Sequence, residues 1–202
     1  MKFSTALAAA AAAISLSSAL PATDPYEGFP KPPAGTIYYY FKVKAKAGQP
    51  TTFNDLYLTA YHTHAGQSDA VLDKTLHPAH RGWFNETVLM WFDSSDNPKE
   101  PEYFELTYSN TLDLGSTSWT KVRIDALSPG DPGLALDAEN KLIFTGQVTN
   151  YEYVSWLVCD WFHSVPQLFA LKKYPPNPKI PSNCAKVDLV AEVAPLEYDR
   201  SR

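Results

Sequence analysis

The sequence predicts an all-β protein with a single domain, built as an antiparallel β-sandwich or as a closed, barrel-like sheet of jelly-roll type. Three observations support this class. Short runs alternate apolar and polar residues, the segments between them are rich in Pro, Gly, Asn, Asp and Ser, and no long segment shows a helical period of 3.6. The sequence also lacks an internal repeat, which argues against a parallel β-helix.

The first 22 residues have the pattern of a secretory signal peptide. Lys2 is followed by an apolar run over residues 5–16 and then by small residues, so we expect cleavage after Ala19 or Ala22. A membrane-spanning helix needs roughly 20 apolar residues, and this run is shorter. The polar C-terminal sequence LEYDRSR lacks the hydrophobic tail of a GPI signal. We therefore expect a secreted, extracellular protein with no membrane span or anchor.

The rest of the chain divides into three expected segments. Residues 23–35 form a Pro-rich leader, residues 36–194 a β-rich domain, and residues 195–202 a polar tail. The formal net charge is −5, and it becomes −6 when the signal peptide is removed with its one charge, that of Lys2. An acidic exported chain is a poor match for nucleic acid or for an anionic membrane. The expected partners are a polysaccharide or an extracellular protein, and no cofactor is expected.

The alternation predicts individual strands. The first covers residues 36–46, TIYYYFKVKAK. Every second residue from Ile37 to Ala45 is expected to face inward, and the three lysines are expected to face water. Residues 134–144 predict two strands around an Ala-Glu-Asn-Lys turn. The best helix candidate is 68–76, SDAVLDKTL, with Ser68 as its N-cap. The remaining expected strands are 56–63, 87–92, 103–108, 119–124, 156–162, 168–173 and 186–193, the last with Val187, Leu189, Ala191 and Val193 inward.

Export also bears on the cysteines and on one asparagine. Cys159 and Cys184 are the only two cysteines, and an oxidising compartment favours a disulfide between them. The chain-entropy model assigns such a bond about 3 kcal/mol of stability. Asn85 begins the only Asn-x-Ser/Thr triplet, so we expect it to be exposed and glycosylated.

Four of the five histidines lie between Tyr61 and His80, as the pairs His62/His64 and His77/His80. A His-x-His pair on a strand places both rings on one face, where they can chelate zinc or copper with a third ligand such as His77, His80, Asp73 or His163. The simpler interpretation is that His62 and His64 close the apolar face of the preceding strand, while Pro78 marks a surface turn. The sequence favours this second interpretation, because the spacing alone is weakly specific.

The segment from Trp156 to Phe169, WLVCDWFHSVPQLF, is the most apolar of the mature chain. Alternation places Trp161 and His163 on one face and Asp160 on the other. An Asp in so apolar a run is expected to be hydrogen-bonded or close to solvent, because its unpaired burial is costly. Asp160 and His163 can simply anchor the turn that follows, or they can form a ligand-binding site with Trp161 and a neighbouring tyrosine such as Tyr61.

The same segment resembles a known family, together with YHT-x-AG-x-SDAVL (Tyr61 to Leu72) and IPSNCAKVDLV (Ile180 to Val190). These motifs are similar to those of small secreted proteins of filamentous fungi, mainly ascomycetes, that share a domain of unknown function. The resemblance covers Ile37 to Val193. It implies secretion, one disulfide and a β-rich fold, and it transfers no catalytic residue.

No catalytic motif favours an enzyme. The chain lacks Gly-x-Ser-x-Gly, His-Glu-x-x-His and a Gly-rich phosphate loop, although a pair of carboxylates that meets only in the fold stays open. The leading hypothesis is a non-catalytic secreted protein that binds glycan or protein at the cell surface or in the host or substrate environment. The alternatives are a metal-dependent secreted enzyme that uses His62 and His64, and a secreted effector that acts through variable loops.

Overall fold

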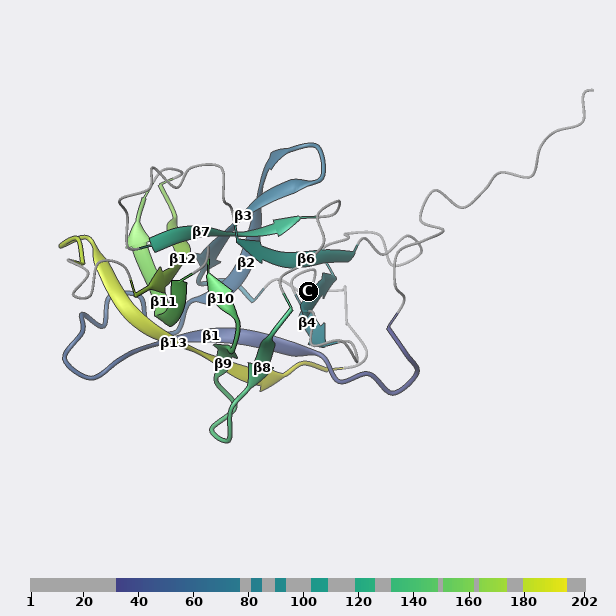
Figure 1. Cartoon of the computed structure of the whole chain (residues 1–202). Coiled ribbons are helices and arrows are strands. Elements are labelled where there is room, and N and C mark those ends of the chain that lie inside the picture. The colour runs from purple at the N-terminus through teal and green to yellow at the C-terminus, as the bar shows by residue number, and fades with distance from the viewer. Residues whose placement is uncertain are drawn as a thin grey trace, which may run out of the picture.

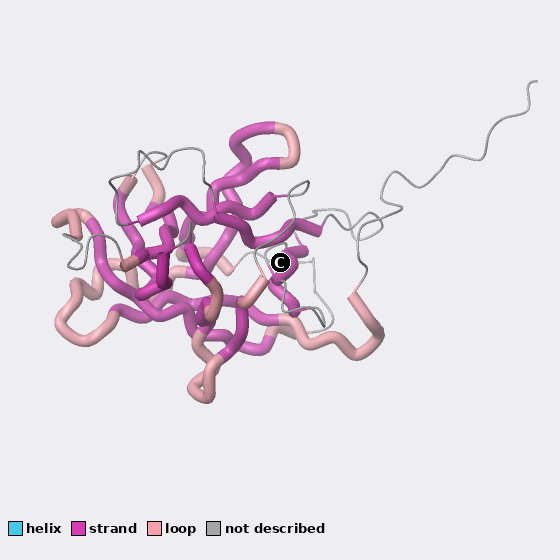
Figure 2. Tube along the Cα trace, in the orientation of Figure 1, coloured by secondary structure: helices cyan, strands magenta, loops and turns pink. Residues whose placement is uncertain are grey.

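The computed structural model of the chain contains thirteen described strands (Figure 1). It describes residues 32–76, 81–84, 90–93, 103–108, 119–125, 132–148, 151–161, 164–173 and 180–195. The strands are β1 Tyr39–Ala45, β2 Tyr57–His64, β3 Gln67–Asp73, β4 Arg81–Phe84, β5 Met90–Asp93, β6 Tyr103–Tyr108, β7 Trp119–Asp125, β8 Leu134–Leu136, β9 Leu142–Phe144, β10 Gln147–Val148, β11 Tyr151–Asp160, β12 Pro166–Lys172 and β13 Cys184–Val193. Every regular element in these ranges is a strand, which confirms the predicted all-β class (Figure 2).

The main sheet closes on itself, so the barrel-like alternative is the one the structure adopts. Seven strands, β1, β2, β3, β7, β6, β5 and β4, form a closed circuit of antiparallel neighbours. A second circuit runs from β3 through β12, β11 and β13 to β1, and β2 closes it because β2 pairs with both β1 and β3. Closure pairs strands that would otherwise leave open edges for other chains.

One large apolar cluster fills the inside of the sheet, and we call the face that carries it the inner face. The alternation in β1, β11 and β13 supplies Phe41, Trp156 and Leu189 to this cluster, each nearly inaccessible to solvent. A smaller cluster lies on the opposite, outer face of β11, β12 and β13. Its buried members are Leu157, Cys159, Phe169 and Cys184. The two clusters confirm the predicted alternation of Trp156 and Val158 against Leu157 and Cys159.

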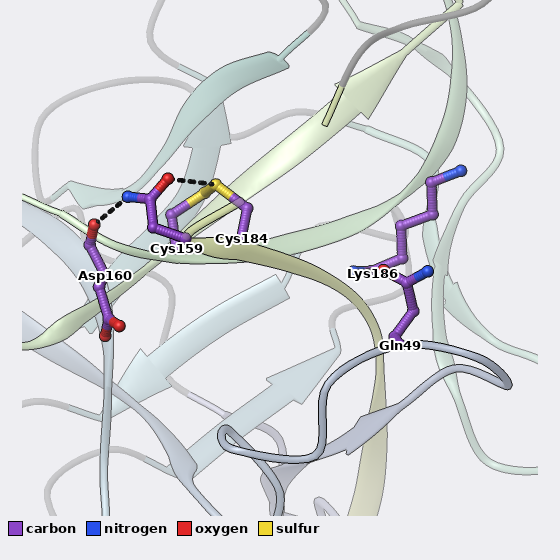
Figure 3. Close-up of a disulfide and its surroundings, with 6 residues drawn as sticks. Gln49, Cys159, Asp160, Cys184 and Lys186 are labelled. Atoms are coloured by element: carbon purple, nitrogen blue, oxygen red, sulfur yellow. Dashed lines mark hydrogen bonds between the residues drawn. A yellow bond between two sulfur atoms is a disulfide. The ribbon is translucent and has the colours of Figure 1, made fainter. Parts of the chain in front are cut away.

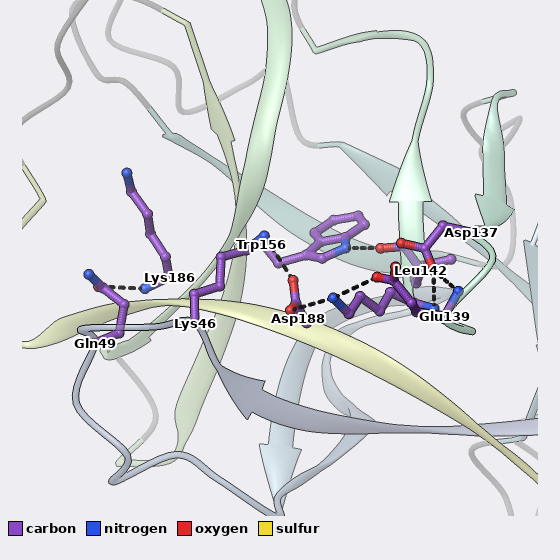
Figure 4. A network of polar contacts seen from close by, with 9 residues as sticks. Lys46, Gln49, Asp137, Glu139, Leu142, Trp156, Lys186 and Asp188 are labelled. Carbon is purple, nitrogen blue, oxygen red and sulfur yellow. Dashed lines mark hydrogen bonds and ion pairs between the residues drawn. The ribbon is translucent and has the colours of Figure 1, made fainter.

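The β8–β9 hairpin, a separate two-stranded sheet, was predicted and packs against the inner cluster. Leu134, Leu142 and Phe144 belong to that cluster, and the indole Nε1 of Trp156 donates a hydrogen bond of 2.6 Å to the Leu142 carbonyl. At the turn, Asn140 takes a φ of 58°, a conformation that Asn tolerates better than most residues. The hairpin is thereby bound to β11 by both apolar packing and a hydrogen bond (Figure 4).

Ion pairs join the same hairpin to β13. Lys141 lies 3.0 Å from a carboxylate oxygen of Glu139 and 3.3 Å from one of Asp188, and Lys46 lies 2.8 Å from the other Asp188 oxygen. Burial acts to raise the pKa of Asp188, but hydrogen bonds and charge from Lys46 and Lys141 outweigh it and hold that pKa below its ordinary value. The network in Figure 4 therefore keeps Asp188 ionised between two lysines.

The helix predicted over 68–76 is wrong, because Gln67–Asp73 form strand β3 instead. Ala70 and Leu72 face the inner cluster, while Asp69 and Asp73 lie on the outer face, so the true period is two. Gly66, with a φ of 69°, makes the tight turn that returns the chain antiparallel to β2. Pairing with β2 and β7 outweighs the local N-cap signal of Ser68.

Three predictions of which way a side chain faces are also wrong. Val193 was expected inward, but 73 % of its surface is exposed, because it lies at the end of β13 opposite Tyr39, the first residue of β1. Ile37 precedes β1 and is exposed for a similar reason. Tyr40 was expected to face water but is buried, with its ring packed edge-on against Tyr57 at 6.5 Å.

Three strand segments were not predicted. The first two residues of β4, Arg81 and Gly82, were interpreted as the end of the surface turn around Pro78, and the two-residue β10 is too short to show a period. The first half of β11, from Tyr151 to Ser155, carries a register irregularity between Tyr153 and Ser155 that breaks the alternation. Local pattern alone therefore misses the strands that are defined by their partners.

Candidate functional site

The Cys159–Cys184 disulfide joins two residues that lie directly opposite each other on β11 and β13 (Figure 3). Their Cα atoms are 4.0 Å apart, the short separation of a non-hydrogen-bonded antiparallel pair. Both side chains are buried in the outer cluster, where Leu157 and Phe169 surround them. The predicted disulfide is confirmed, and it fastens the end of β11 to the start of β13.

Asn183 fastens the next residue pair of the same two strands. The backbone N–H of Asp160 donates to the Asn183 carbonyl at 3.0 Å, and the Asn183 Nδ2 donates to the Asp160 carbonyl at 2.6 Å. The Asn183 Oδ1 also lies 3.7 Å from the Cys184 Sγ, a packing contact because neither atom carries a hydrogen. The backbone of Asp160 is thus bonded on both of its polar atoms, directly beside the disulfide.

The Asp160 side chain, in contrast, is exposed to solvent, which is one of the two outcomes expected for an Asp in so apolar a run. Figure 3 shows its carboxylate pointing away from the disulfide. Among the carboxylates whose side chains the structure describes, Asp160 is the one that joins no ion pair and accepts no hydrogen bond. It is therefore available as a hydrogen-bond acceptor and a negative charge.

Trp161 follows β11 directly and has 46 % of its surface exposed, whereas Trp83 and Trp156 are buried. Its indole packs edge-to-face against Phe169, with ring centroids 5.8 Å apart and planes at 81°. Phe169 is itself buried in the outer cluster beside the disulfide. The exposed indole thus rests on a rigid base, which is the arrangement that a stacking surface for a ligand requires.

Tyr61 is also exposed, at 41 %, but the fold does not bring it to Trp161. Tyr61 lies on β2, and β3 and β12 run between β2 and β11. Three inter-strand spacings of about 4.8 Å separate the two strands along the sheet, or roughly 14 Å. The fold therefore does not bring together all four candidate residues of the ligand site. Tyr61 lies apart from Asp160 and Trp161, and His163 lies outside the described residues.

The expectation that His62 and His64 share one face is wrong. The pairing of β2 with β3 shifts by one residue at Thr63, so that His62 lies opposite Ser68 while His64 lies opposite Gln67. Ser68 and Gln67 are neighbours on one strand and face opposite sides, so the two histidines do as well. Both are exposed near the turn of the hairpin that extends at the top of Figure 1.

Of the other proposed metal ligands, only Asp73 lies in the described part of the chain, opposite Tyr57 at the far end of the β2–β3 pair from His62 and His64. His77, His80, His163 and the glycosylation candidate Asn85 lie outside the described residues. Within the described part of the chain, no group of three or more His, Cys, Asp or Glu side chains is placed to hold a metal ion. The metal site on His62 and His64 stays a prediction, without the one-face geometry on which it rested.

A buried ion-pair cluster on the outer face of β3 and β7 has a structural explanation. Lys121 lies 3.4 Å from Asp69, Arg123 lies 3.2 Å from Asp125, and the Ser68 N–H donates to Asp125 at 3.3 Å. Burial raises the pKa of Asp125, and Arg123 and the Ser68 N–H only partly oppose this effect. Because both carboxylates are paired, the cluster satisfies its own buried charges.

Sequence reasoning did not identify Phe169 and Asn183 as partners of the site. Both carried a signal: if Cys159 lies opposite Cys184 in antiparallel strands, then Asp160 lies opposite residue 183. Phe169 lies between the inward residues Leu168 and Ala170, so alternation places an aromatic ring on the outer face.

The comparisons with known proteins identify one family. A model described as a domain of unknown function, DUF7907, matches residues 36–193, which is more than half of the chain. No curated protein and no solved structure matches the chain. In the part of the chain that the structure describes, no helix has the length and apolar character needed to span a membrane.

Proposed function

The chain belongs to the DUF7907 family, and on that premise we propose that it is an exported, non-catalytic protein of a filamentous fungus that binds a glycan through Trp161. In this proposal, residues 1–22 are removed as a signal peptide, 23–35 are a leader, and Asn85 carries a glycan. The signal pattern, the disulfide and the acidic charge support an extracellular site of action.

The observation that carries the proposal is the exposed indole of Trp161 on its buried support. Leaving a large aromatic ring in water forgoes the free energy of burial, and such rings are characteristic of binding surfaces. Phe169 holds the indole from one side, and the disulfide and Asn183 hold the backbone that carries it. A preorganised surface loses little side-chain entropy when a ligand binds.

A sugar ring suits this surface because its apolar C–H face can stack on an indole. Asp160 precedes the indole in the chain, but alternation along β11 turns its carboxylate to the other face, so stacking on Trp161 is the contact that the proposal uses. An extracellular protein partner is the competing outcome, and the experiment below separates the two.

The test is retention of the purified mature protein on insoluble chitin, β-glucan, cellulose and mannan. We expect retention on at least one of them, and we expect Trp161→Ala to abolish it. Tyr61→Ala is the matched control, because among the described side chains it removes the second exposed aromatic ring, at a distant position, and this variant should bind normally. Near-UV circular dichroism and thermal unfolding confirm that both variants keep the fold.

The proposal fails if the wild-type protein is retained on none of these polysaccharides. It also fails if Trp161→Ala binds as well as the wild type. Equal loss in the Tyr61→Ala control would instead place the binding surface elsewhere on the sheet, and Trp161 would then have no special role.

A further inference from the structure

We infer that Gln167 is the residue that hydrogen-bonds the glycan at the Trp161 site, and that it selects sugar rings with two adjacent free hydroxyl groups. This inference rests on the proposed function and names the substrate class of the same site. The observation that carries it is a buried amide without partners. Gln167 is 0 % exposed, and in the described part of the chain neither its Oε1 nor its Nε2 makes a hydrogen bond.

An amide in this state is costly for the fold. Removing its donor and acceptor from water without a replacement bond opposes folding, and buried polar groups are therefore almost always paired. Gln49 shows the usual arrangement, because its Oε1 accepts a hydrogen bond of 3.1 Å from the Lys186 backbone N–H (Figure 4). Among the described residues, Gln167 is the one that keeps two such side-chain atoms buried and unpaired. A group that the fold leaves unpaired is one that a ligand can pair.

Gln167 projects from the same face of the sheet as the indole. It lies directly opposite Cys159 and two residues before Phe169, so all three side chains are on the outer face. Trp161 is on that face as well, because its ring packs against Phe169. The indole and the amide therefore belong to one surface of the molecule.

The two aromatic rings approach each other across the row that contains Gln167. Phe169 lies opposite Leu157, four residues before Trp161, which is about 13 Å along the strand. Their ring centroids are nevertheless 5.8 Å apart, so both side chains lean over the row between them, where Cys159 and Gln167 are paired. The contact between the rings thus lies beside the amide, and the indole is the part of it that reaches solvent.

A turn of the Trp161 side chain opens a path to Gln167. The indole contacts Phe169 edge-to-face, and a rotation about its side-chain bonds separates the two rings. The backbone need not move, because the disulfide and Asn183 fasten it. A sugar stacked on the turned indole then meets the amide on the same face, and the hydrogen bonds formed there offset the lost contact between the rings.

The amide determines which sugars fit. It presents an acceptor and a donor side by side, and two adjacent hydroxyl groups match it, because one can donate while the other accepts. A 1,4-linked glucan carries such a pair on every ring. A 1,3-linked glucan lacks the pair on its internal rings, because the linkage occupies the oxygen between the two remaining ring hydroxyls. The site should therefore prefer the 1,4-linked chain.

The experiment compares cellohexaose with laminarihexaose, two glucose hexamers with 1,4 and 1,3 linkages. Isothermal titration calorimetry of the mature protein should show about tenfold tighter binding of cellohexaose, because laminarihexaose forgoes roughly two hydrogen bonds. Gln167→Met keeps the length of the side chain but removes the amide, so it should abolish this preference. It should also unfold at a higher urea concentration than the wild type, since no unpaired amide is left.

Gln49→Met is the matched control. It removes an amide that is bonded, so it should unfold at a lower urea concentration than the wild type and should keep the preference for cellohexaose. The opposite signs of the two stability changes distinguish an amide that is kept for a ligand from one that holds the fold.

Equal affinity of the wild type for the two hexamers, or binding of neither, overturns the inference, while retention on a polysaccharide would still support the proposed function. The inference is also overturned if Gln167→Met keeps the preference. It is overturned as well if this variant unfolds at a lower urea concentration than the wild type, since the amide would then be bonded within the fold. If the wild type is retained on no polysaccharide, the proposed function fails together with the inference.

Discussion

The end of β11 and the tip of the β2–β3 hairpin both present an exposed aromatic residue, but they differ in what supports it. Trp161 packs on buried Phe169 and follows a strand end that a disulfide and two hydrogen bonds fasten to β13. Tyr61 precedes a bulge at Thr63 and a turn whose histidines are exposed. An exposed ring indicates a binding surface more strongly when a buried base holds it.

The largest effect is expected from Phe169→Ala. Removal of a buried aromatic side chain costs about 3–5 kcal/mol of unfolding free energy, and here it also removes the base of the indole. Urea unfolding measures the first effect, and a red shift of tryptophan emission reports the second. Tyr61→Ala, made at the other region, should stay within about 0.5 kcal/mol of the wild type. If the two variants lose equal amounts of unfolding free energy, the end of β11 is no better supported than the tip of the β2–β3 hairpin.

The disulfide should contribute the next largest effect. A Cys159→Ser, Cys184→Ser double variant is expected to lose about 2–4 kcal/mol of unfolding free energy. Denaturant unfolding of this variant beside oxidised wild type measures the difference. If the two unfold at the same denaturant concentration, the β11 end does not depend on its covalent bond.

Asn183→Ala tests the side-chain hydrogen bond at the same end. Loss of the 2.6 Å bond to the Asp160 carbonyl should cost about 1 kcal/mol. Glycan affinity should fall with it, because Trp161 follows Asp160. Asn183→Asp retains the side chain's size but not its donor, so it should behave like the Ala variant; wild-type stability in either variant would show that the bond is dispensable.

The smallest effect is expected at the hairpin tip. A His62→Ala, His64→Ala double variant should change the unfolding free energy by less than about 0.5 kcal/mol, because both side chains are exposed. Plasma mass spectrometry of the dialysed wild-type protein supplies the second measurement. Near-stoichiometric zinc or copper that is lost in the double variant would contradict the assignment of these histidines to the surface and revive the metal-dependent enzyme.

The parts of the fold that could be predicted from the sequence depend on local alternation of apolar and polar residues, or on the number of cysteines. The β6 range and the β8–β9 hairpin followed from alternation and turn residues, and the disulfide from the presence of only two cysteines. Strand β3 was missed because Asp69 and Asp73, on its outer face, together with Ser68, resemble the polar side of a short helix. The ion pair between Asp69 of β3 and Lys121 of β7 joins two positions that are far apart in the sequence.

Part of the environment of the candidate site could be predicted. Asp160 was expected to be hydrogen-bonded or close to solvent, because its unpaired burial is costly, and its side chain is exposed; the binding of a ligand at Asp160 and Trp161 stays a prediction. The separation of Tyr61 from them depends on strand order, which places β3 and β12 in between. The division of His62 from His64 depends on one inserted residue, and a strict period of two cannot reveal it.

The cross-strand disulfide also has a consequence for how the chain reaches this fold. A slip of one residue between β11 and β13 would turn Cys159 and Cys184 to opposite faces of the sheet, where their sulfur atoms could not meet. Once β11 and β13 are paired, oxidation can therefore be completed only in molecules that have aligned the two strands correctly. During maturation in an oxidising compartment the bond would act as a checkpoint, covalently retaining correctly aligned chains and leaving slipped ones with reactive thiols.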